Sequence, residues 1–83
     1  MRERRYYRKK KGLEWRLADT GELFVQDKRQ NKIFVLRGEQ ITLWLCLSGR
    51  MSLSDLRRFS GVSQGKLSYH IELIEKVGLI KRS

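Results

Sequence analysis

The sequence predicts an α+β domain in which an N-terminal three-stranded antiparallel meander is followed by three helices. Three observations lead to this fold class. Between residues 13 and 36, three short segments with the character of strands are separated by polar turns, and in the first of them apolar and polar residues alternate at the period of two. From residue 38 onward, apolar residues recur every three or four positions, as they do on the buried stripe of a helix. The chain has 83 residues, which suffices for one small core and not for two.

The meander is predicted from three short segments that are separated by turns. We expect strands at LEWRL, ELFVQ and KIFVL, which are residues 13–17, 22–26 and 32–36. The first alternates strictly, which predicts one buried face made by Leu13, Trp15 and Leu17. Gly21 ends the turn ADTG, and Asn31 closes the polar loop DKRQN before the third strand. Both residue types tolerate positive φ, so both segments are predicted turns.

Three helices are predicted in the second half of the chain. We expect them at about residues 38–48, 54–60 and 63–77, with a short extended piece at 51–53 before the second. Ser54 and Ser63 are the predicted N-caps, because a serine hydroxyl accepts a hydrogen bond from a free N–H of the first turn. Gly61 and Gly78 are the predicted stops, because glycine adopts the left-handed conformation that ends helices. The predicted apolar stripe of the first helix is Ile41, Trp44, Leu45 and Leu47, and the second helix carries Leu56 and Phe59.

The composition excludes several classes of protein. No apolar run approaches the length of a membrane-spanning helix, and no apolar segment follows the basic start as it would in a secretory signal. A single cysteine, Cys46, excludes an intramolecular disulfide and a cysteine-rich metal site. We find no nucleophile–base pair, phosphate-binding loop or carboxylate pair, so we expect no enzymatic activity, metal or cofactor. A cytoplasmic, nucleoid-associated protein fits these features.

Four conspicuous side chains have a structural explanation. His70 is the only histidine, and we expect it to be half-buried and hydrogen-bonded rather than a ligand. Cys46 lies within an apolar helix and is expected to be a packed thiol. Trp15 and Trp44 are expected in the core, where the sheet meets the first helix.

The charge is strongly positive and unevenly distributed. Lys and Arg number 19 against 9 Asp and Glu, which gives a net charge of +10 and favours a polyanionic partner. Residues 1–11 hold seven basic residues and one acid, so more than half of the net charge lies there. We expect residues 1–12 to form a flexible basic arm. The arm is either a solubilising tail or a nucleic-acid contact, in which Tyr6 and Tyr7 would stack on sugars or bases.

The last predicted helix has two different faces. The predicted buried face consists of Leu67, Ile71 and Ile74 with the flanking Leu73 and Val77, which recur at spacings of three and four. The other face, near the helix start, is polar and compact, as a helix in the major groove requires. Gly65 on this face lowers helix propensity by about 1 kcal/mol relative to Ala. Close approach of a backbone, from DNA or from the preceding helix, would justify that cost.

The two last helices and the turn GVS between them have helix-turn-helix spacing, in which Val62 fills the angle between the helices. Arg57 and Arg58 project from the helix at residues 54–60 toward a phosphate backbone. The free N–H groups at the start of the next helix, at Ser63, suit a phosphate. Any one of these residues alone would be an ordinary surface residue, but the group indicates binding. The predicted DNA-binding residues are Ser63, Gln64, Gly65, Lys66, Ser68, Tyr69, Arg57 and Arg58, with Arg5, Arg8, Lys9 and Lys10 from the arm.

The segment LSDLRRFSGVSQGKLSYHIELIEKVGLIKR resembles the helix-turn-helix core of winged-helix transcription regulators, most closely the ArsR-like and MarR-like groups. The resemblance covers about residues 38–82 and implies a three-helix DNA-binding core. It also implies recognition positions at Ser63, Gln64, Lys66, Ser68 and Tyr69. The ArsR-like paired-cysteine metal motif is absent, so no metal-sensing role carries over.

This chain departs from those regulators at both ends. They continue after Gly-Leu-Ile into a β-hairpin wing, whereas here we expect a strand at residues 79–82 without a return strand. Three N-terminal strands also stand where the family usually has a helix. We expect the loop DKRQN or the basic arm to substitute for the wing.

The leading hypothesis is a sequence-specific regulator that binds double-stranded DNA, with the third helix in the major groove. Such regulators usually bind as dimers. We expect the first helix, through Leu43, Trp44 and Leu47, to contribute to a homodimer surface, because a domain of this size buries few residues alone. We expect no membrane partner and no small-molecule effector.

Two other hypotheses remain. The segment KIFVLRGEQITLWLCLSGRMSLSDL resembles the PqqD-like peptide recognition domains, which imply capture of a leader peptide as an added strand, with KIFVL as the candidate edge. An acidic leader peptide would also account for the basic charge. The third hypothesis is an RNA-binding module that uses the arm and its tyrosines.

Overall fold

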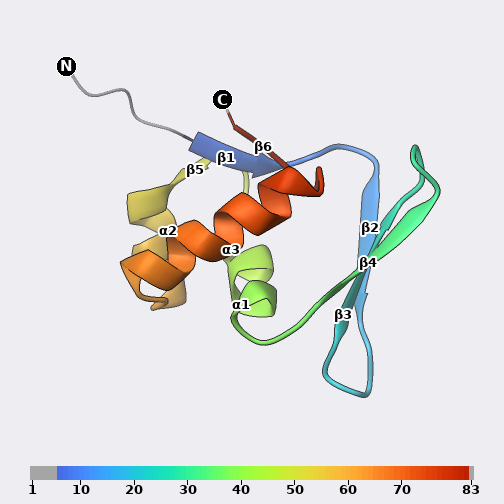
Figure 1. The fold of residues 1–83 in the computed structure, drawn as a ribbon, viewed down its shortest axis with the longest axis horizontal. Coiled ribbons are helices and arrows are strands. Elements are labelled where there is room, and N and C mark those ends of the chain that lie inside the picture. The colour runs from blue at the N-terminus through green and yellow to red at the C-terminus, as the bar shows by residue number, and fades with distance from the viewer. Residues whose placement is uncertain (1–5, 83) are drawn as a thin grey trace.

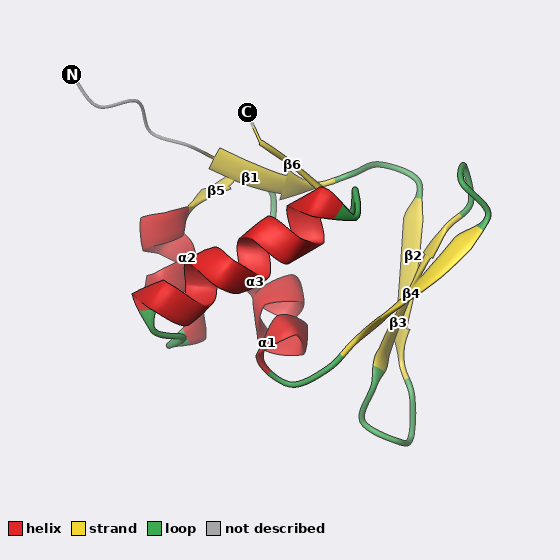
Figure 2. Ribbon diagram, viewed as in Figure 1, coloured by secondary structure: helices red, strands yellow, loops and turns green. Residues whose placement is uncertain are grey.

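Residues 6–82 form three helices and two separate three-stranded antiparallel sheets (Figures 1 and 2), so the predicted α+β class is confirmed. A computed structural model describes residues 6–82. Its elements are β1 (Tyr6–Lys9), β2 (Leu13–Leu17), β3 (Leu23–Asp27), β4 (Lys32–Leu36), α1 (Glu39–Cys46), β5 (Met51–Ser52), α2 (Leu53–Ser60), α3 (Gln64–Lys76) and β6 (Ile80–Arg82). Within this part of the chain, no helix is both long and apolar enough to span a membrane.

The first sheet is a meander of β2, β3 and β4 that stands beside the helices in Figure 1. Two of its strands have the predicted bounds, and β3 starts one residue later than predicted. The turns also form as predicted, with Gly21 at φ 88° and Asn31 at φ 53°. Alternation along β3 buries Leu23 and Val25, which makes this the sheet's main contribution to the core.

The predicted buried face of β2 is wrong. Leu13 is half-buried, but Trp15 is 44% exposed and Leu17 is 57% exposed. The strand order explains the difference, because β2 is an edge strand with β3 between it and β4. Trp15 retains one contact with the core, an edge-to-face contact with Trp44 at 5.5 Å between ring centroids. Alternation therefore predicted the strand correctly and overestimated how far its apolar face is covered.

The second sheet has the order β5–β1–β6 and includes residues predicted to be a flexible arm. Tyr7 lies opposite Met51 of β5 and Arg82 of β6, and it is only 4% exposed. The arm assignment is therefore wrong for Tyr6–Lys9, and Tyr7 is not available to stack on a base. The segment forms a strand because the Tyr7 ring belongs to the core cluster while Arg8 is exposed. Its basic composition alone did not indicate this alternation. Residues 1–5 lie outside the described part of the chain.

The strand expected near the C-terminal end forms as β6, and its antiparallel partner is β1. The return strand that the sequence did not predict after residue 82 is thus supplied by the N-terminal part of the chain. The alternative partner, the loop DKRQN, belongs to the separate meander and pairs with neither strand.

The helix ends follow the predicted residue types with one shift. α2 is capped by Ser52 rather than Ser54, through a capping box in which Asp55 N donates to Ser52 Oγ and Ser52 N donates to Asp55 Oδ2. Only Ser52 has the acidic residue three positions later that completes this motif. Gly61 ends α2 in the left-handed conformation, as predicted. Ser63 occupies the predicted N-cap position of α3, but its side chain does not make the predicted capping hydrogen bond.

The core includes residues from all three helices, and among them are the α1 residues that were predicted to form a dimer surface. Leu43, Trp44 and Leu47 of α1 are at most 3% exposed within the single chain, so they cannot form a surface between two copies. Leu45, which we placed on the buried stripe of this helix, is instead 56% exposed. The buried stripe is rotated relative to the predicted one because Leu43, and not Leu45, faces the rest of the core.

Candidate nucleic-acid interface

The turn between α2 and α3 fixes the start of α3 at the surface. Gly61 takes φ 73°, which ends α2, and Val62 is buried as predicted. One face of α3 then packs inward through Leu67, Ile71 and Ile74. Of the flanking residues predicted with them, Leu73 is half-buried and Val77 is 44% exposed, so the prediction is wrong for Val77, which lies at the end of the helix. The opposite face of its first half is left on the outside of the molecule, toward the left-hand side of Figure 1.

The structure brings most of the predicted recognition residues together at this end of α3. Ser63, Gln64, Gly65, Lys66 and Tyr69 are exposed, and Ser68 is half-buried. Arg57 and Arg58 are also exposed, in the last turn of α2 just before the turn into α3. None of these side chains is covered by either sheet. We call this group of eight residues the α3 face.

Gly65 has no structural role in the described part of the chain. A Cβ placed on it would meet no atom within 4 Å, and its backbone is not in the left-handed region. Close packing against α2, one of the two explanations offered by the sequence, is therefore wrong. Packing within the described residues therefore gives no reason for glycine at this position.

The N-terminus of α3 has the features of an anion site. Ser63 occupies the N-cap position, yet its side chain makes no capping hydrogen bond. The first turn of α3 also has no acidic residue. The unpaired N–H groups of this turn and the positive end of the helix dipole are thus not neutralised by the chain's own side chains.

The charges near this face are only weakly paired. Lys66 Nζ lies 3.7 Å from Glu39 Oε1, with both side chains largely in solvent, so the pair contributes little and releases Lys66 easily. His70 is half-buried as predicted, and its Nε2 lies 4.0 Å from the same oxygen. Its buried Nδ1 has no hydrogen-bond partner, so the predicted hydrogen bonding is wrong at that atom. Tyr69 contacts the His70 ring edge-on at 5.4 Å.

The arm residues that we predicted to bind DNA do not join the α3 face. Arg8 and Lys10 lie beside β6 and Gly78, at the opposite end of α3 from Gln64. Lys9 points inward, with Nζ 4.3 Å and 4.9 Å from the ring centroids of Trp15 and Trp44. Burial lowers the pKa of Lys9, because desolvation disfavours its charged form. Arg5 lies outside the described residues.

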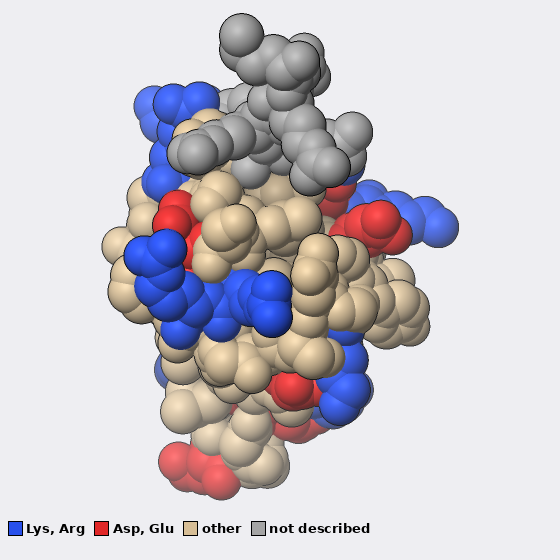
Figure 3. Space-filling model, turned by 90° about the vertical axis from the view of Figure 1, so that its left-hand side faces the viewer, with Lys and Arg blue, Asp and Glu red and all other residues tan. Residues whose placement is uncertain are grey.

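The α3 side of the molecule is also partly apolar. Figure 3 shows basic groups separated by large uncharged areas on this side. Phe59, at the end of α2, is 65% exposed, although we expected it to belong with Leu56 on the apolar pattern of that helix. An eight-residue helix gives too few turns for periodicity to show which apolar residue points outward.

A second surface has a different chemistry. β4 pairs only with β3, so its other edge is free of partners among residues 6–82. A cavity of about 170 Å³ lies between β4 and the second half of α3. It is lined mainly by apolar side chains, including Phe34, Leu73 and Val77. The sequence predicted β4 as the candidate edge strand of this surface. It did not predict that α3 forms the other wall of the cavity, which only the structure shows.

Comparison of the chain with protein-family models, with curated proteins and with solved structures finds no significant match in any of the three. The proposal for function therefore depends on these two surfaces.

Proposed function

We propose that the protein is a sequence-specific regulator that binds double-stranded DNA through the α3 face. The observation that carries this proposal is that α3 buries one face, whereas its N-terminal half exposes compact polar side chains that nothing in the described chain covers. In this proposal α1, α2 and α3, together with the β5–β1–β6 sheet, act as a winged-helix-type core. The family resemblance and the net charge of +10 support it.

Each part of the α3 face has a physical role in this proposal. Gln64, Lys66, Ser68 and Tyr69 would meet base edges in the major groove, where amide and ammonium groups discriminate between bases. Arg57, Arg58 and the free N–H groups after Ser63 would hold phosphates on either side. Gly65 would allow the helix to enter the groove closely. The proposal includes no catalysis and no cofactor, and it places the protein with the nucleoid in the cytoplasm.

We also propose that the protein binds DNA as a homodimer, since two half-sites one helical turn apart multiply affinity. Because the predicted α1 residues are buried, the exposed apolar residues Leu45 and Phe59 are better candidates for the contact. Sedimentation at micromolar concentration tests this directly. Monomers alone, in the presence and absence of duplex DNA, would exclude the dimer.

Selection from a pool of random duplexes tests the main proposal. We expect enrichment of a sequence motif, and a palindromic motif if the protein dimerises. Competition with a matched double-stranded RNA separates DNA from RNA recognition, because A-form RNA closes the groove that α3 would enter. Failure to enrich any motif, or preference for RNA in the competition, would reject the assignment.

Replacement of Lys66 with alanine tests the role of one side chain. We expect one of two results: the log–log slope of affinity against salt decreases by about one unit if Lys66 meets a phosphate, or preference at one base pair is relaxed if it meets a guanine. Titration of the selected duplex at several salt concentrations measures both quantities. An unchanged slope together with unchanged preference would remove Lys66 from the contact.

A peptide-binding function is the second candidate, and the free edge of β4 beside its apolar cavity favours it. An extended peptide would add a strand to β4 and place alternate side chains against α3. The structure gives this candidate both components that strand addition needs. Capture of peptides from a random display library tests it, and a genomic neighbour encoding a peptide-modifying enzyme would support it.

Replacement of Val77 with glutamate separates the two candidates. Val77 lines the cavity but is 44% exposed, so the charged side chain should cost little folding stability. If peptides bind beside β4, we expect their affinity to fall by about tenfold or more, because a carboxylate replaces apolar contact area, and duplex affinity to stay unchanged. Leu17→Glu is the matched control, because Leu17 is an exposed leucine on β2, on the far side of β3 from β4, and does not line the cavity. Equal peptide binding by both variants would exclude the site beside β4.

A further inference from the structure

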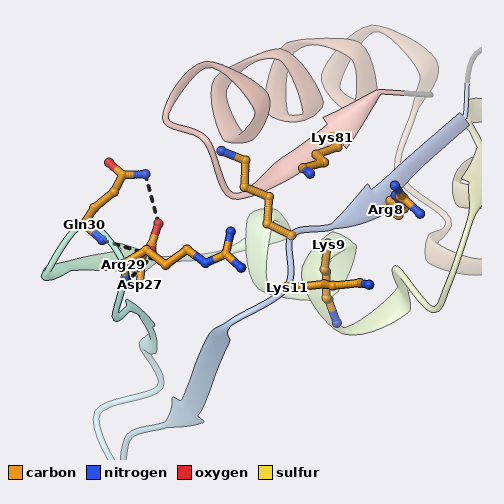
Figure 4. A pocket seen from close by; sticks show the side chains of 8 residues that line it. Arg8, Lys9, Lys11, Asp27, Arg29, Gln30 and Lys81 are labelled. Carbon is orange, nitrogen blue, oxygen red and sulfur yellow. Dashed lines mark hydrogen bonds between the residues drawn. The ribbon is translucent and has the colours of Figure 1, made fainter.

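A cavity of about 470 Å³ lies where β1 and the linker that follows it, the β3–β4 turn and β6 come together (Figure 4). We call it the cationic pocket. Six of the eight residues that line it are basic: Arg8, Lys9, Lys10, Lys11, Arg29 and Lys81, with Asp27 and Gln30 completing the wall. Its volume is in the range of ligand sites. It lies at the C-terminal end of α3, whereas the α3 face lies on its N-terminal half. At a rise of 1.5 Å per residue, about 10 Å of helix separates Tyr69, the last residue of that face, from the end of α3 at Lys76.

Backbone pairing, rather than attraction to acids, brings these cations together. Arg8 and Lys81 are directly opposite in the β1–β6 ladder, so their side chains share the outer face of that sheet. Lys10 N donates to Leu79 O at 3.1 Å, which ties the linker after β1 to the residue before β6. The positions are therefore fixed by the fold, although like charges in such proximity repel one another.

Two glycines leave space for the basic side chains. Gly78 has φ 88°, and a Cβ on it would lie 3.2 Å from Lys10 Nζ. Gly12 has φ 81°, and a Cβ there would lie 3.7 Å from Arg29 Nε. Lys10 and Arg29 thus extend across backbone that carries no side chain of its own. Figure 4 shows Arg29 reaching from its turn toward the linker after β1.

The single acidic residue in the wall, Asp27, accepts hydrogen bonds within the β3–β4 turn. Asp27 is 4% exposed and accepts hydrogen bonds from Arg29 N at 3.0 Å, from Gln30 N at 3.4 Å and from Gln30 Nε2 at 2.9 Å (Figure 4). Its carboxylate shapes the β3–β4 turn and makes no ion pair with the basic residues around the pocket. Asp27 therefore orients Arg29 without neutralising it.

None of the six basic residues forms an ion pair with a carboxylate within residues 6–82. Elsewhere the same part of the chain pairs Lys28 with Glu14 at 2.8 Å and Arg82 with Glu75 at 2.7 Å. In the turn between β3 and β4, Lys28 pairs with an acidic residue, whereas its neighbour Arg29 has no acidic partner within residues 6–82. Lys9 contributes only to the wall, because its ammonium group lies over the Trp15 and Trp44 rings. Five cations remain for a ligand.

We propose that the cationic pocket binds a ligand with two or more adjacent phosphate groups. One phosphate carries a charge of about −1.5 to −2 at neutral pH, so a single group would leave most of the cluster unbalanced. Guanidinium and ammonium groups held in fixed positions are the donors that phosphate oxygens prefer. The adjacent phosphates belong either to a free polyphosphate compound or to one strand of a nucleic acid. The site is separate from the α3 face and does not depend on its function.

Calorimetric titration of the full chain with inorganic triphosphate tests the free ligand. We expect the Lys10→Gln/Arg29→Gln variant to bind at least about tenfold more weakly than wild type, since two charge-assisted contacts are lost. Arg16→Gln/Lys28→Gln is the matched control: it removes the same charge, and neither residue lines the pocket. The Arg8→Gln/Lys81→Gln variant is a second measurement should the first variant fold poorly.

Titration of duplex DNA against salt distinguishes the two sources of phosphate. If nucleic-acid phosphates fill the pocket, Lys10→Gln/Arg29→Gln lowers the log–log salt slope by about two units relative to the control. If a free compound fills it, triphosphate binding is lost and the duplex slope is unchanged. The proposal is overturned if the pocket variants and the control bind both probes equally. Gly65→Glu, which acts on the α3 face, should retain triphosphate binding, so the two proposals can fail independently.

Discussion

The Gly65→Glu protein is expected to fold at least as stably as wild type and to lose duplex binding. A Cβ at this position meets no atom, and replacing glycine within a helix raises the free energy of unfolding by up to about 1 kcal/mol. An acid in the first turn adds a favourable interaction with the helix dipole. The same carboxylate would face the phosphates of bound DNA, where a like charge costs several kcal/mol. We expect affinity to fall by about 100-fold or more, at 1.4 kcal/mol for each factor of ten.

Stability and affinity should therefore change in opposite directions, which loss of folding cannot imitate. Thermal unfolding measures the first and titration of the selected duplex the second. Gln26→Glu is the control, because it makes the same change in net charge at an exposed position of β3, away from the α3 face. Duplex affinity of Gly65→Glu within about threefold of that control, a difference below 1 kcal/mol, would show that α3 does not meet DNA.

Local patterns predicted the elements that depend on local physics. The alternation of LEWRL and the apolar run KIFVL, each next to a turn, predicted the observed bounds of β2 and β4, and Gly61 and Gly78 end helices as expected. These features depend on residues a few positions apart, so a short window of sequence contains the information. The polar face of α3 was predictable for the same reason. Which residues share a face with Leu67, and which lie on the opposite side, follows from helical spacing within a few neighbouring positions.

Features that depend on distant pairing were not predictable. Tyr7 is buried only because residues from β5 and β6, more than 40 positions away, lie on both sides of β1. No pattern within the basic segment distinguishes a strand from a tail. The cationic pocket is missed for the same reason, because Arg29 and Lys81 meet only through the tertiary fold. The net charge predicted a polyanionic partner, but it did not show where on the molecule the unpaired basic side chains lie.

Replacement of Leu56 with alanine is expected to lower the free energy of unfolding by about 2–5 kcal/mol, the range for deleting a fully buried leucine side chain. Leu56 is 0% exposed and belongs to the cluster that joins the three helices, including Leu43 and Leu67. A domain of this size has a total stability of about 5–15 kcal/mol, so the loss is a large share of it. Denaturant unfolding followed by circular dichroism measures it through the shift in midpoint.

Phe59→Ala on the same helix is the contrasting variant. Its ring is 65% exposed, so the expected change is within about 0.5 kcal/mol of wild type even though the deleted side chain is larger. Side-chain size and hydrophobicity alone predict the reverse order for the two variants. Measured at a concentration where the protein is monomeric, a greater loss of stability for Phe59→Ala than for Leu56→Ala would mean that α2 is rotated about its axis. The same rotation would carry Arg57 and Arg58 away from the α3 face, so this comparison of stabilities also tests the geometry on which DNA binding is proposed.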